Sequence, residues 1–487
     1  MGGRPYPPDF DGKGYPRALV AWASGGSSLG TLQLIDVEHD TVNNQEDTIH
    51  SYTISGFTAL DPVTIQDFPG QQLAYVFSTG GSATGSASFQ PVNTGTDRAG
   101  TAFPGIAPGT TSVYITGDLQ YVYSVSPVVT HSSQGYLTSL RISDGAAALI
   151  PLASANKLAP SPGAASGSGS LLIFAANANN GSNDVYQLVG TGENPIYQCT
   201  QQILPSIPFD HPMNALYSSD GASAFIFNCG PECGGTTASV SILSTSAMAA
   251  AAAPAFQPVL GCNINPAYTP APVTLSMLPN QNIPVPGGVT DAIQMGTTLF
   301  VTGQAQYPNG EWGGFLTAID LTNPTPATTQ TYVIGDGTHF RIRIGDAGAT
   351  GVSNTLWIAA GSGGGCSDGE QSTLANGSTG CITMVPVAAN GNAYSVAGTC
   401  TTASPAPVLP SGYPMAQSCS SIVIEPNQGT AGGVAPITGW YKTYTVENGG
   451  VFIYSTIDGS AISNYNVQVR GYANDIAFID GTTNTAP

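Results

Sequence analysis

The side chains that could carry chemistry in this chain are few, and they lie far apart in the sequence. The five histidines show neither HExxH nor HxH spacing, and no phosphate-binding glycine loop of the common types is present. What remains are polar residues near the start of apolar, strand-like segments. A ring of such groups could bind a polar ligand or a cation, with calcium as the choice that carboxylate oxygens favour. The residues of this candidate site are Asp61, Asp210, His211, Asp291, His339, Arg341 and Asp475.

Eight cysteines form no CxxC motif and no Cys/His cluster, which favours disulfides over metal ligands and therefore an oxidising compartment. Unpaired buried thiols are the alternative. The first residues lack the apolar centre of a signal peptide. Because the cysteines indicate an oxidising compartment, we interpret the chain as the mature part of an exported protein. Proximity in the sequence predicts four disulfides: Cys229–Cys233, Cys366–Cys381, Cys400–Cys419 and, from the remaining residues, Cys199–Cys262.

The elements that must position these residues are short strands in a repeated unit. Residues 213–244 predict three consecutive strands, with Ser219-Asp220-Gly221 as the first turn and a cysteine-flanked hairpin as the second. Such a meander cannot bury both faces alone, so it must stack on other units. Eight segments fit its second strand: Ala18–Ser24, Leu73–Ser78, Gln120–Ser126, Ser170–Ala176, Ala222–Asn228, Thr297–Gly303, Thr355–Ala360 and Val451–Thr456.

These repeats predict an all-β fold, a β-propeller of eight blades, with seven as the alternative if Thr401–Val469 is an appendage. Asn474–Asp480 is typical of a first strand with no partner after it, so we expect the C-terminal strand to close the ring in the first blade. The expected organisation is a Pro-rich lead at 1–17, one propeller domain at 18–480 with an insert at about 401–439, and a tail at 481–487.

Composition agrees with this fold and excludes some partners. The 61 glycines and 37 prolines of the 487 residues favour many turns over long helices. A formal net charge of −19 makes nucleic acid an unfavourable partner, and no apolar run reaches the length of a transmembrane segment. Only 8% of the residues are charged, so the surface must consist mostly of uncharged polar side chains.

The run from Asn228 to Val240, NCGPECGGTTASV, resembles a hairpin of bacterial surface propellers of the YVTN-repeat type. The close match covers about thirty residues. The YVTN tetrad itself is missing, and the segments most similar to it are Phe225–Asn228 and Leu299–Thr302. The resemblance implies a propeller fold and an extracellular or cell-surface location, with a lipid anchor in the full-length form as an alternative. It implies no reaction and no catalytic residues.

The leading functional hypothesis is a non-enzymatic extracellular or cell-surface scaffold that binds a partner protein, a carbohydrate or another ligand. One alternative is a lactonase-like propeller hydrolase with a metal in the central channel, which would need several oxygen ligands at one depth. Another is a structural subunit that self-assembles. The alternation of residues 440–446 predicts that Trp440 and Tyr444 share one face of a strand, where they could stack on a sugar ring or cover a small local core.

Overall fold

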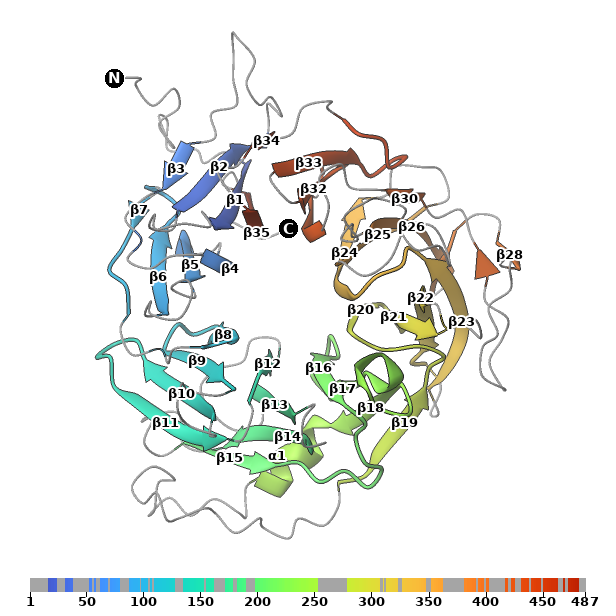
Figure 1. The fold of residues 1–487 in the computed structure, drawn as a ribbon, viewed down its shortest axis with the longest axis horizontal. Coiled ribbons are helices and arrows are strands. Elements are labelled where there is room, and N and C mark those ends of the chain that lie inside the picture. Colours follow the sequence, from blue (N-terminus) through green and yellow to red (C-terminus); the bar gives the residue numbers. More distant parts are fainter. Residues whose placement is uncertain are drawn as a thin grey trace.

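The computed structural model forms a ring of eight β-sheets, as Figure 1 shows. It describes residues 16–23, 31–37, 52–54, 57, 62–68, 71–78, 87–96, 98–103, 106, 109–127, 135–152, 155–161, 171–177, 182–189, 198–252, 278–306, 310, 312–322, 326–346, 352–361, 381–390, 393–397, 400–402, 417–418, 422–424, 431–437, 439–447, 450–462, 467–468 and 472–480.

Each sheet is one blade, and its strands run in order from the ring axis to the rim. Blade 1 contains β35 (Tyr472–Asp480), β1 (Pro16–Ala23), β2 (Thr31–Asp36) and β3 (Tyr52–Ile54). Blade 2 contains β4 (Pro62–Phe68), β5 (Leu73–Ser78), β6 (Ser88–Asn93) and β7 (Arg98–Ala99). Blade 3 contains β8 (Ser112–Ile115), β9 (Tyr121–Ser126), β10 (Gly135–Arg141) and β11 (Ala147–Leu152). Blade 4 contains β12 (Lys157–Pro160), β13 (Leu171–Asn177), β14 (Ser182–Val189) and β15 (Cys199–Gln202).

The second half of the ring carries additional elements. Blade 5 contains β16 (Pro212–Tyr217), β17 (Ser223–Asn228), the 3₁₀ turn η3 (Gly230–Cys233), β18 (Ser239–Ser244), the helix α1 (Thr245–Ala252) and β19 (Asn280–Pro284). Blade 6 contains β20 (Asp291–Met295), β21 (Thr298–Gln306), β22 (Trp312–Asp320) and β23 (Ala327–Ile334), extended by β29 (Gln417–Ser418) and β28 (Thr401–Thr402). Blade 7 contains β24 (His339–Asp346), β25 (Asn354–Ala360), β26 (Cys381–Asn390) and β27 (Ala393–Val396), and β30 (Ile422–Ile424) also pairs with β26. Blade 8 contains β31 (Ala431–Ile437), β32 (Lys442–Glu447), β33 (Gly450–Ser455) and β34 (Val467–Gln468).

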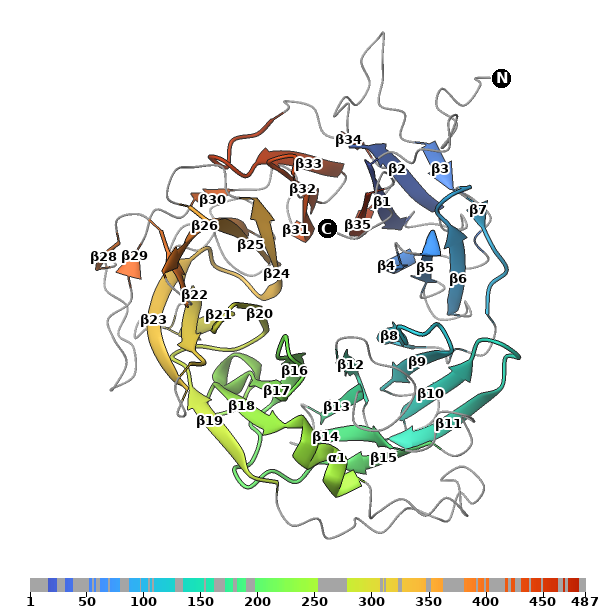
Figure 2. The ribbon, with the colours of Figure 1, turned by 180° about the vertical axis from the view of Figure 1, so that it is seen from behind.

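The ring closes as the sequence predicts, because the C-terminal strand β35 is the innermost strand of blade 1. It pairs antiparallel with β1, with Ala18 opposite Phe478 and Val20 opposite Ile476. Figure 2 shows from behind that the dark red β35 lies beside the blue β1. This pairing joins the two ends of the described chain and completes blade 1 as a four-stranded sheet, which closes the ring.

The second strand of each blade lies between the neighbouring blades, and in β17 it is apolar because these blades cover both of its faces. In β17, Ala224 and Ile226 pack with Phe174 in a core shared with blade 4, whereas Phe225 and Phe227 pack in a core shared with blade 6. Alternate residues point to opposite faces of a strand, so one run of four apolar residues supports two interfaces. The hydrophobic cores therefore lie between blades, all the way round the ring.

Two predictions about the repeat need correction. Each blade has four strands rather than three, because a fourth strand pairs at the rim. In blade 8 the assignment was one strand late: Gly450–Ser455 is the third strand, and the second is Lys442–Glu447. The reason is that both segments carry buried apolar residues at alternate positions, Tyr444 with Val446 and Val451 with Ile453, and the tertiary pairing alone distinguishes them. Within residues 401–439, β31 is the innermost strand of this blade.

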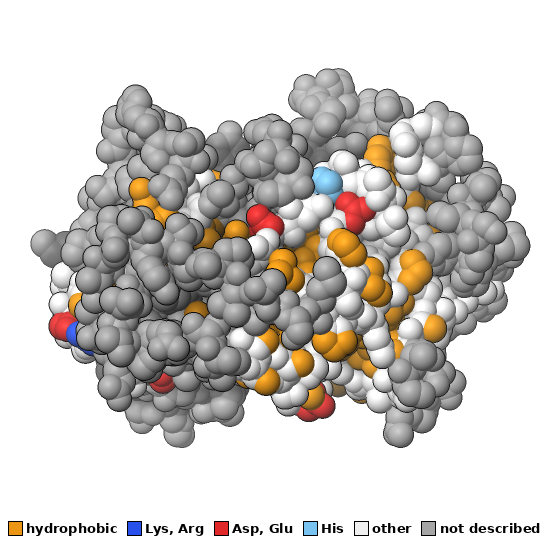
Figure 3. Space-filling view, turned by 90° about the horizontal axis from the view of Figure 1, so that it is seen from below, with side chains coloured by type: hydrophobic (Ala, Val, Ile, Leu, Met, Phe, Trp, Pro, Cys, Tyr) orange, Lys and Arg blue, Asp and Glu red, His pale blue; other side chains and the backbone are white. Residues whose placement is uncertain are grey.

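The surface is poor in charge, as the composition predicts. In the side view of Figure 3, the coloured residues are mostly hydrophobic or uncharged polar, with few acidic and basic side chains among them. In the described part of the chain, no helix is long and apolar enough to cross a membrane.

Candidate functional site

Three of the predicted site residues meet near the ring axis. Arg341 of β24 donates a hydrogen bond from Nη1 to Asp475 Oδ1 of β35 at 2.7 Å, which is an ion pair between blades 7 and 1. The other oxygen, Asp475 Oδ2, accepts a bond from the Ile65 backbone N–H of β4 at 3.0 Å. Asp475 is 4% exposed. Its two oxygens link the innermost strands of three blades, β35 of blade 1, β24 of blade 7 and β4 of blade 2.

Asp291 begins β20 and accepts a hydrogen bond from the Ile342 backbone N–H at 3.1 Å. Its charge also interacts with Arg343 on β24 and with Lys157 on β12. Blade 4, which holds Lys157, borders neither blade 6 nor blade 7, as Figure 1 shows. Lys157 can therefore interact with Asp291 and Arg341 only across the axis. We call Lys157, Asp291, Arg341, Arg343 and Asp475 the axial cluster.

In the axial cluster Asp475 is buried, Lys157, Asp291 and Arg341 are half-buried, and Arg343 is exposed to solvent. Burial raises the pKa of Asp291, and the charges of Arg343 and Lys157 oppose this effect. Burial lowers the pKa of Lys157, which the Asp291 carboxylate counteracts and Arg341 reinforces. Desolvation also lowers the pKa of Arg343. Three cationic groups against two carboxylates give the cluster an excess of positive charge, in a chain whose formal net charge is −19.

Some donors of the axial cluster have no acceptor among the residues that the structure describes. Arg343 donates from Nη1 to the Ile342 carbonyl at 2.8 Å, and this is its one hydrogen bond within the described residues. Lys157 makes ionic interactions but no hydrogen bond with the described part of the chain. Because an ammonium has three donors and a guanidinium has five, both groups keep donors for another acceptor.

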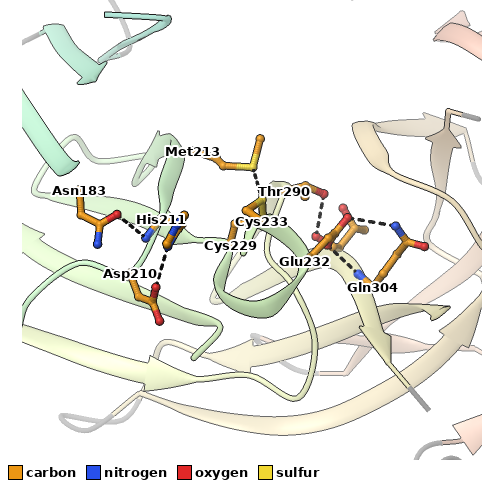
Figure 4. The surroundings of a disulfide bond; sticks show 10 residues. Asn183, Asp210, His211, Met213, Cys229, Glu232, Cys233, Thr290 and Gln304 are labelled. Atoms are coloured by element: carbon orange, nitrogen blue, oxygen red, sulfur yellow. Dashed lines mark hydrogen bonds and ion pairs between the residues drawn. A yellow bond between two sulfur atoms is a disulfide. The ribbon is translucent and has the colours of Figure 1, made fainter. Parts of the chain in front are cut away.

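Asp210 and His211 do not join the axial cluster; instead they hold the hairpin of blade 5, shown in Figure 4. Asp210 Oδ2 accepts bonds from the Thr236 N–H, the Thr236 hydroxyl and the Thr237 N–H, each at 2.7 Å. His211 Nδ1 lies 2.9 Å from Asp210 Oδ1. Partial burial tends to raise the pKa of Asp210, but the bonds from His211, Thr236 and Thr237 lower it to about 2. These carboxylate oxygens are thus occupied by the hairpin itself.

The hairpin also reaches the next blade. Glu232 accepts bonds from the Gln304 N–H at 2.9 Å and from its side-chain amide at 3.1 Å, while burial raises the pKa of the carboxyl. Two positions of the hairpin require glycine. Gly230 has φ +62° and the Ala238 backbone lies against it, and Gly234 has φ +90°. A side chain at Gly235 would collide with Asp210. The residues of the hairpin motif therefore stabilise a tightly packed local structure.

His339 is buried between blades 6 and 7. Its Nε2 lies 2.9 Å from the Gly335 carbonyl, so Nε2 carries the proton in the neutral ring. Burial lowers the pKa of His339 to about 4, and the bond to Gly335 only partly offsets this. At neutral pH the side chain is an uncharged core residue. Asp61 lies outside the described residues.

The disulfide predicted between Cys229 and Cys233 is present, with 5.6 Å between the Cα atoms. Cys381 and Cys400 are also disulfide-bonded. Their predicted partners Cys366 and Cys419, and Cys262, lie outside the described residues, and the side chain of Cys199 is not described. Those three pairings stay predictions.

The aromatic patch predicted from Trp440 and Tyr444 does not form. Trp440 is 39% exposed in the turn before β32, whereas Tyr444 is fully buried in the core between blades 8 and 1. Lys442 Nζ lies 5.0 Å from the Trp440 ring centre and 6.0 Å from that of Tyr444. The residue exposed next to Trp440 is Tyr441, at 50%. Alternation does not apply across this boundary because Trp440 precedes the strand.

Reasoning from the sequence missed Lys157 and Arg343. Two signals were available: the chain has only ten lysines and arginines, and Arg341 and Arg343 stand two residues apart, which places both on one face of a strand. The rarity of basic residues makes a cluster of three informative. Their convergence with Asp291 required the ring.

Comparisons with known proteins support the fold. No family model and no curated protein matches the chain. A dihydro-heme d1 dehydrogenase solved in complex with DHE is 10% identical over 96% of this chain and 76% of its own, with a TM-score of 0.54. A periplasmic gluconolactonase of Pseudomonas aeruginosa is 13% identical over 97% and 99%, with a TM-score of 0.48. A functionally unknown Desulfotomaculum acetoxidans protein is 12% identical over 95% and 98%, with a TM-score of 0.46. At such identities the similarity concerns the fold.

Proposed function

We propose that this protein is a non-enzymatic binding propeller that holds a small anionic ligand, a carboxylate or a phosphate, at the axial cluster. The observation that carries the proposal is the position of Lys157, Arg341 and Arg343 on the innermost strands β12 and β24 of two non-adjacent blades, in a chain of only ten lysines and arginines. An acceptor-rich anion matches the unused ammonium and guanidinium donors.

The two carboxylates of the axial cluster only partly neutralise its three cationic groups, which also favours an anionic ligand. Asp475 is already satisfied by Arg341 and Ile65, and Asp291 is bonded to the Ile342 N–H. A metal at the axis, which the hydrolase alternative needs, would face three cationic side chains that repel it. The cluster therefore supports the binding hypothesis over a calcium site.

We further propose an extracellular or cell-surface location. The Cys229–Cys233 disulfide, together with the oxidised state of Cys381 and Cys400, supports an oxidising compartment. A lipid anchor and YVTN-type kinship remain hypotheses that rest on the hairpin sequence.

The test is calorimetric titration with inorganic phosphate and with succinate at low ionic strength. We expect saturable binding that weakens about tenfold or more in Lys157→Gln and in Arg343→Gln, since one charge-assisted hydrogen bond contributes about 1.5 to 3 kcal/mol. Arg141→Gln is the matched control because Arg141 pairs with Asp144 on blade 3, away from the axis.

Two outcomes would contradict the proposal. One is equal affinity in the axial variants and in the Arg141→Gln control. The other is a calcium- or magnesium-dependent rise of the melting temperature that disappears in Asp291→Asn while the anions have no effect. That second result would favour the metal-dependent hydrolase.

A further inference from the structure

A groove with a volume of about 570 Å³ lies between blades 5 and 6. It opens where the β16–β17 turn meets the β20–β21 turn, at the ends of β16 and β17 opposite the disulfide hairpin. This volume falls in the range typical of small-molecule sites, which is about 300 to 1,000 Å³. The groove is lined by Ser218, Ser219, Asp220, Ser223, Phe225, Ile242, Ser244, Pro279, Asn280, Gln281, Gln294, Gly296, Thr297, Leu321 and Pro326.

The lining combines an apolar part with many uncharged polar groups. Phe225, Ile242 and Leu321 belong to the hydrophobic core between the two blades, where they contribute apolar surface to the groove. Serine, threonine, asparagine and glutamine side chains supply the rest, and the lining contains one carboxylate, Asp220, and no lysine, arginine or histidine. This lining does not suit an anionic ligand, because no cationic side chain is present to neutralise the charge of the ligand.

The carboxylate keeps one oxygen free. Asp220 Oδ1 accepts bonds from the Ser218 hydroxyl at 2.6 Å and from the Ala222 N–H at 3.0 Å, which closes the turn. Asp220 Oδ2 and the hydroxyls of Ser219 and Ser223 make no hydrogen bond with the described part of the chain. Two hydroxyls and one carboxylate oxygen are therefore available, on the β16–β17 turn and on the first residue of β17.

The walls of the groove are fixed before any ligand arrives. The Ser219 N–H donates to Gln294 Oε1 at 3.1 Å, and Gln294 Nε2 donates to the Gly296 carbonyl at 2.9 Å, so the two turns are tied together across the blades. Asn280 is held by bonds to Ser206 and Ile207. A preformed site of this kind loses little conformational entropy on binding.

From this lining we infer that the groove binds a neutral saccharide. The ring C–H groups of a sugar fit the apolar residues, and its hydroxyls can donate to Asp220 Oδ2 and bond with Ser219 and Ser223. A polyhydroxylated, uncharged ligand satisfies both parts of the lining, whereas an apolar ligand would leave the polar part without partners. This site is separate from the axial cluster and does not depend on the anion proposal.

The experiment is saturation-transfer NMR and calorimetry of the full chain with maltose, cellobiose, lactose and chitobiose. We expect saturable binding of at least one disaccharide, and at least a tenfold loss in Asp220→Asn. Asparagine keeps an oxygen for the turn but replaces the free carboxylate oxygen with a donor. Ser244→Phe, at the exposed edge of the groove, should block binding by filling it.

Asp458→Asn is the matched control, because Asp458 closes an equivalent turn on blade 8 by accepting from the Ser460 N–H and hydroxyl. Melting temperatures of all variants show that each one folds. The inference is overturned if no disaccharide binds, or if Asp220→Asn and Ser244→Phe bind the sugar as tightly as Asp458→Asn does. Phosphate binding at the axis is unaffected by either groove variant.

Discussion

The hairpin of blade 5 and the axial cluster both concentrate charged side chains, yet they differ in how these groups are satisfied. In the hairpin, Asp210 and Glu232 accept bonds from the backbone and side chains around them. At the axis, Lys157 and Arg343 keep donors with no acceptor in the described part of the chain.

The difference separates structural from functional charge. A carboxylate whose oxygens are all used by its own loop stabilises that loop and has little capacity for a ligand. Cationic groups held across an axis by strands from different blades repel one another, a cost that a protein seldom accepts for stability alone. Under the proposed function the axial charges serve ligand binding, whereas the charges of the hairpin stabilise the fold.

The largest expected effect is at the axis itself. Asp475→Ala removes the partner of Arg341 and leaves the Ile65 N–H unpaired, so we expect a loss of about 3 to 5 kcal/mol in the free energy of unfolding. Urea denaturation measures it. Asp144→Ala breaks the exposed pair with Arg141 and should change stability little. Equal effects of the two variants would remove the distinction between axial and surface pairs.

The pH dependence of stability tests the burial of His339. Its pKa is lowered from 6.5 to about 4 in the folded state, so between these values only the unfolded chain binds the proton. Stability from this group is therefore complete above pH 6.5 and falls as the pH drops towards 4, by about 3 kcal/mol. Denaturation midpoints across this window measure the slope, and an NMR titration of the ring measures the pKa. A ring that titrates near pH 6.5 would contradict the prediction.

A smaller loss is expected at the hairpin. Asp210→Ala removes three hydrogen bonds to Thr236 and Thr237, which should cost about 2 kcal/mol because the site is partly exposed. Phosphate affinity should stay unchanged, since Asp210 does not join the axial cluster. Weakened anion binding in a folded Asp210→Ala protein would show that the hairpin and the axis act together. Asp320→Ala, which affects only the bonds to Thr322, serves as the control.

The smallest effect belongs to the disulfide. Cys229 and Cys233 are four residues apart, and so short a loop loses little entropy on closure. We expect a Cys229→Ala/Cys233→Ala double variant to lose about 1 to 2 kcal/mol and to keep the ring. Thermal denaturation and circular dichroism measure both quantities. A loss larger than that of Asp475→Ala would reverse the order of the comparison.

The hairpin could be predicted because its determinants are contiguous. Gly230 and Gly234 adopt positive φ, and Cys229 bonds to Cys233 within the same short run of sequence. The axial cluster could be predicted only in part. Asp291, Arg341 and Asp475 lie on the innermost strands β20, β24 and β35, and their role in ligand binding stays a prediction. His339 was placed there too, but its side chain packs between blades. Strand position alone does not determine which way a side chain points.

The sequence by itself predicted eight blades, with seven as the alternative, and it determined the closure by the C-terminal strand and the hairpin, because strand periodicity, turn residues and short loops act over a few residues. The meeting of Lys157 with Asp291 and Arg341, and the groove between blades 5 and 6, were decided by the tertiary structure. Both depend on how blades are placed around a common axis. That placement comes from the packing of all the inter-blade cores together, which no local pattern in the chain specifies.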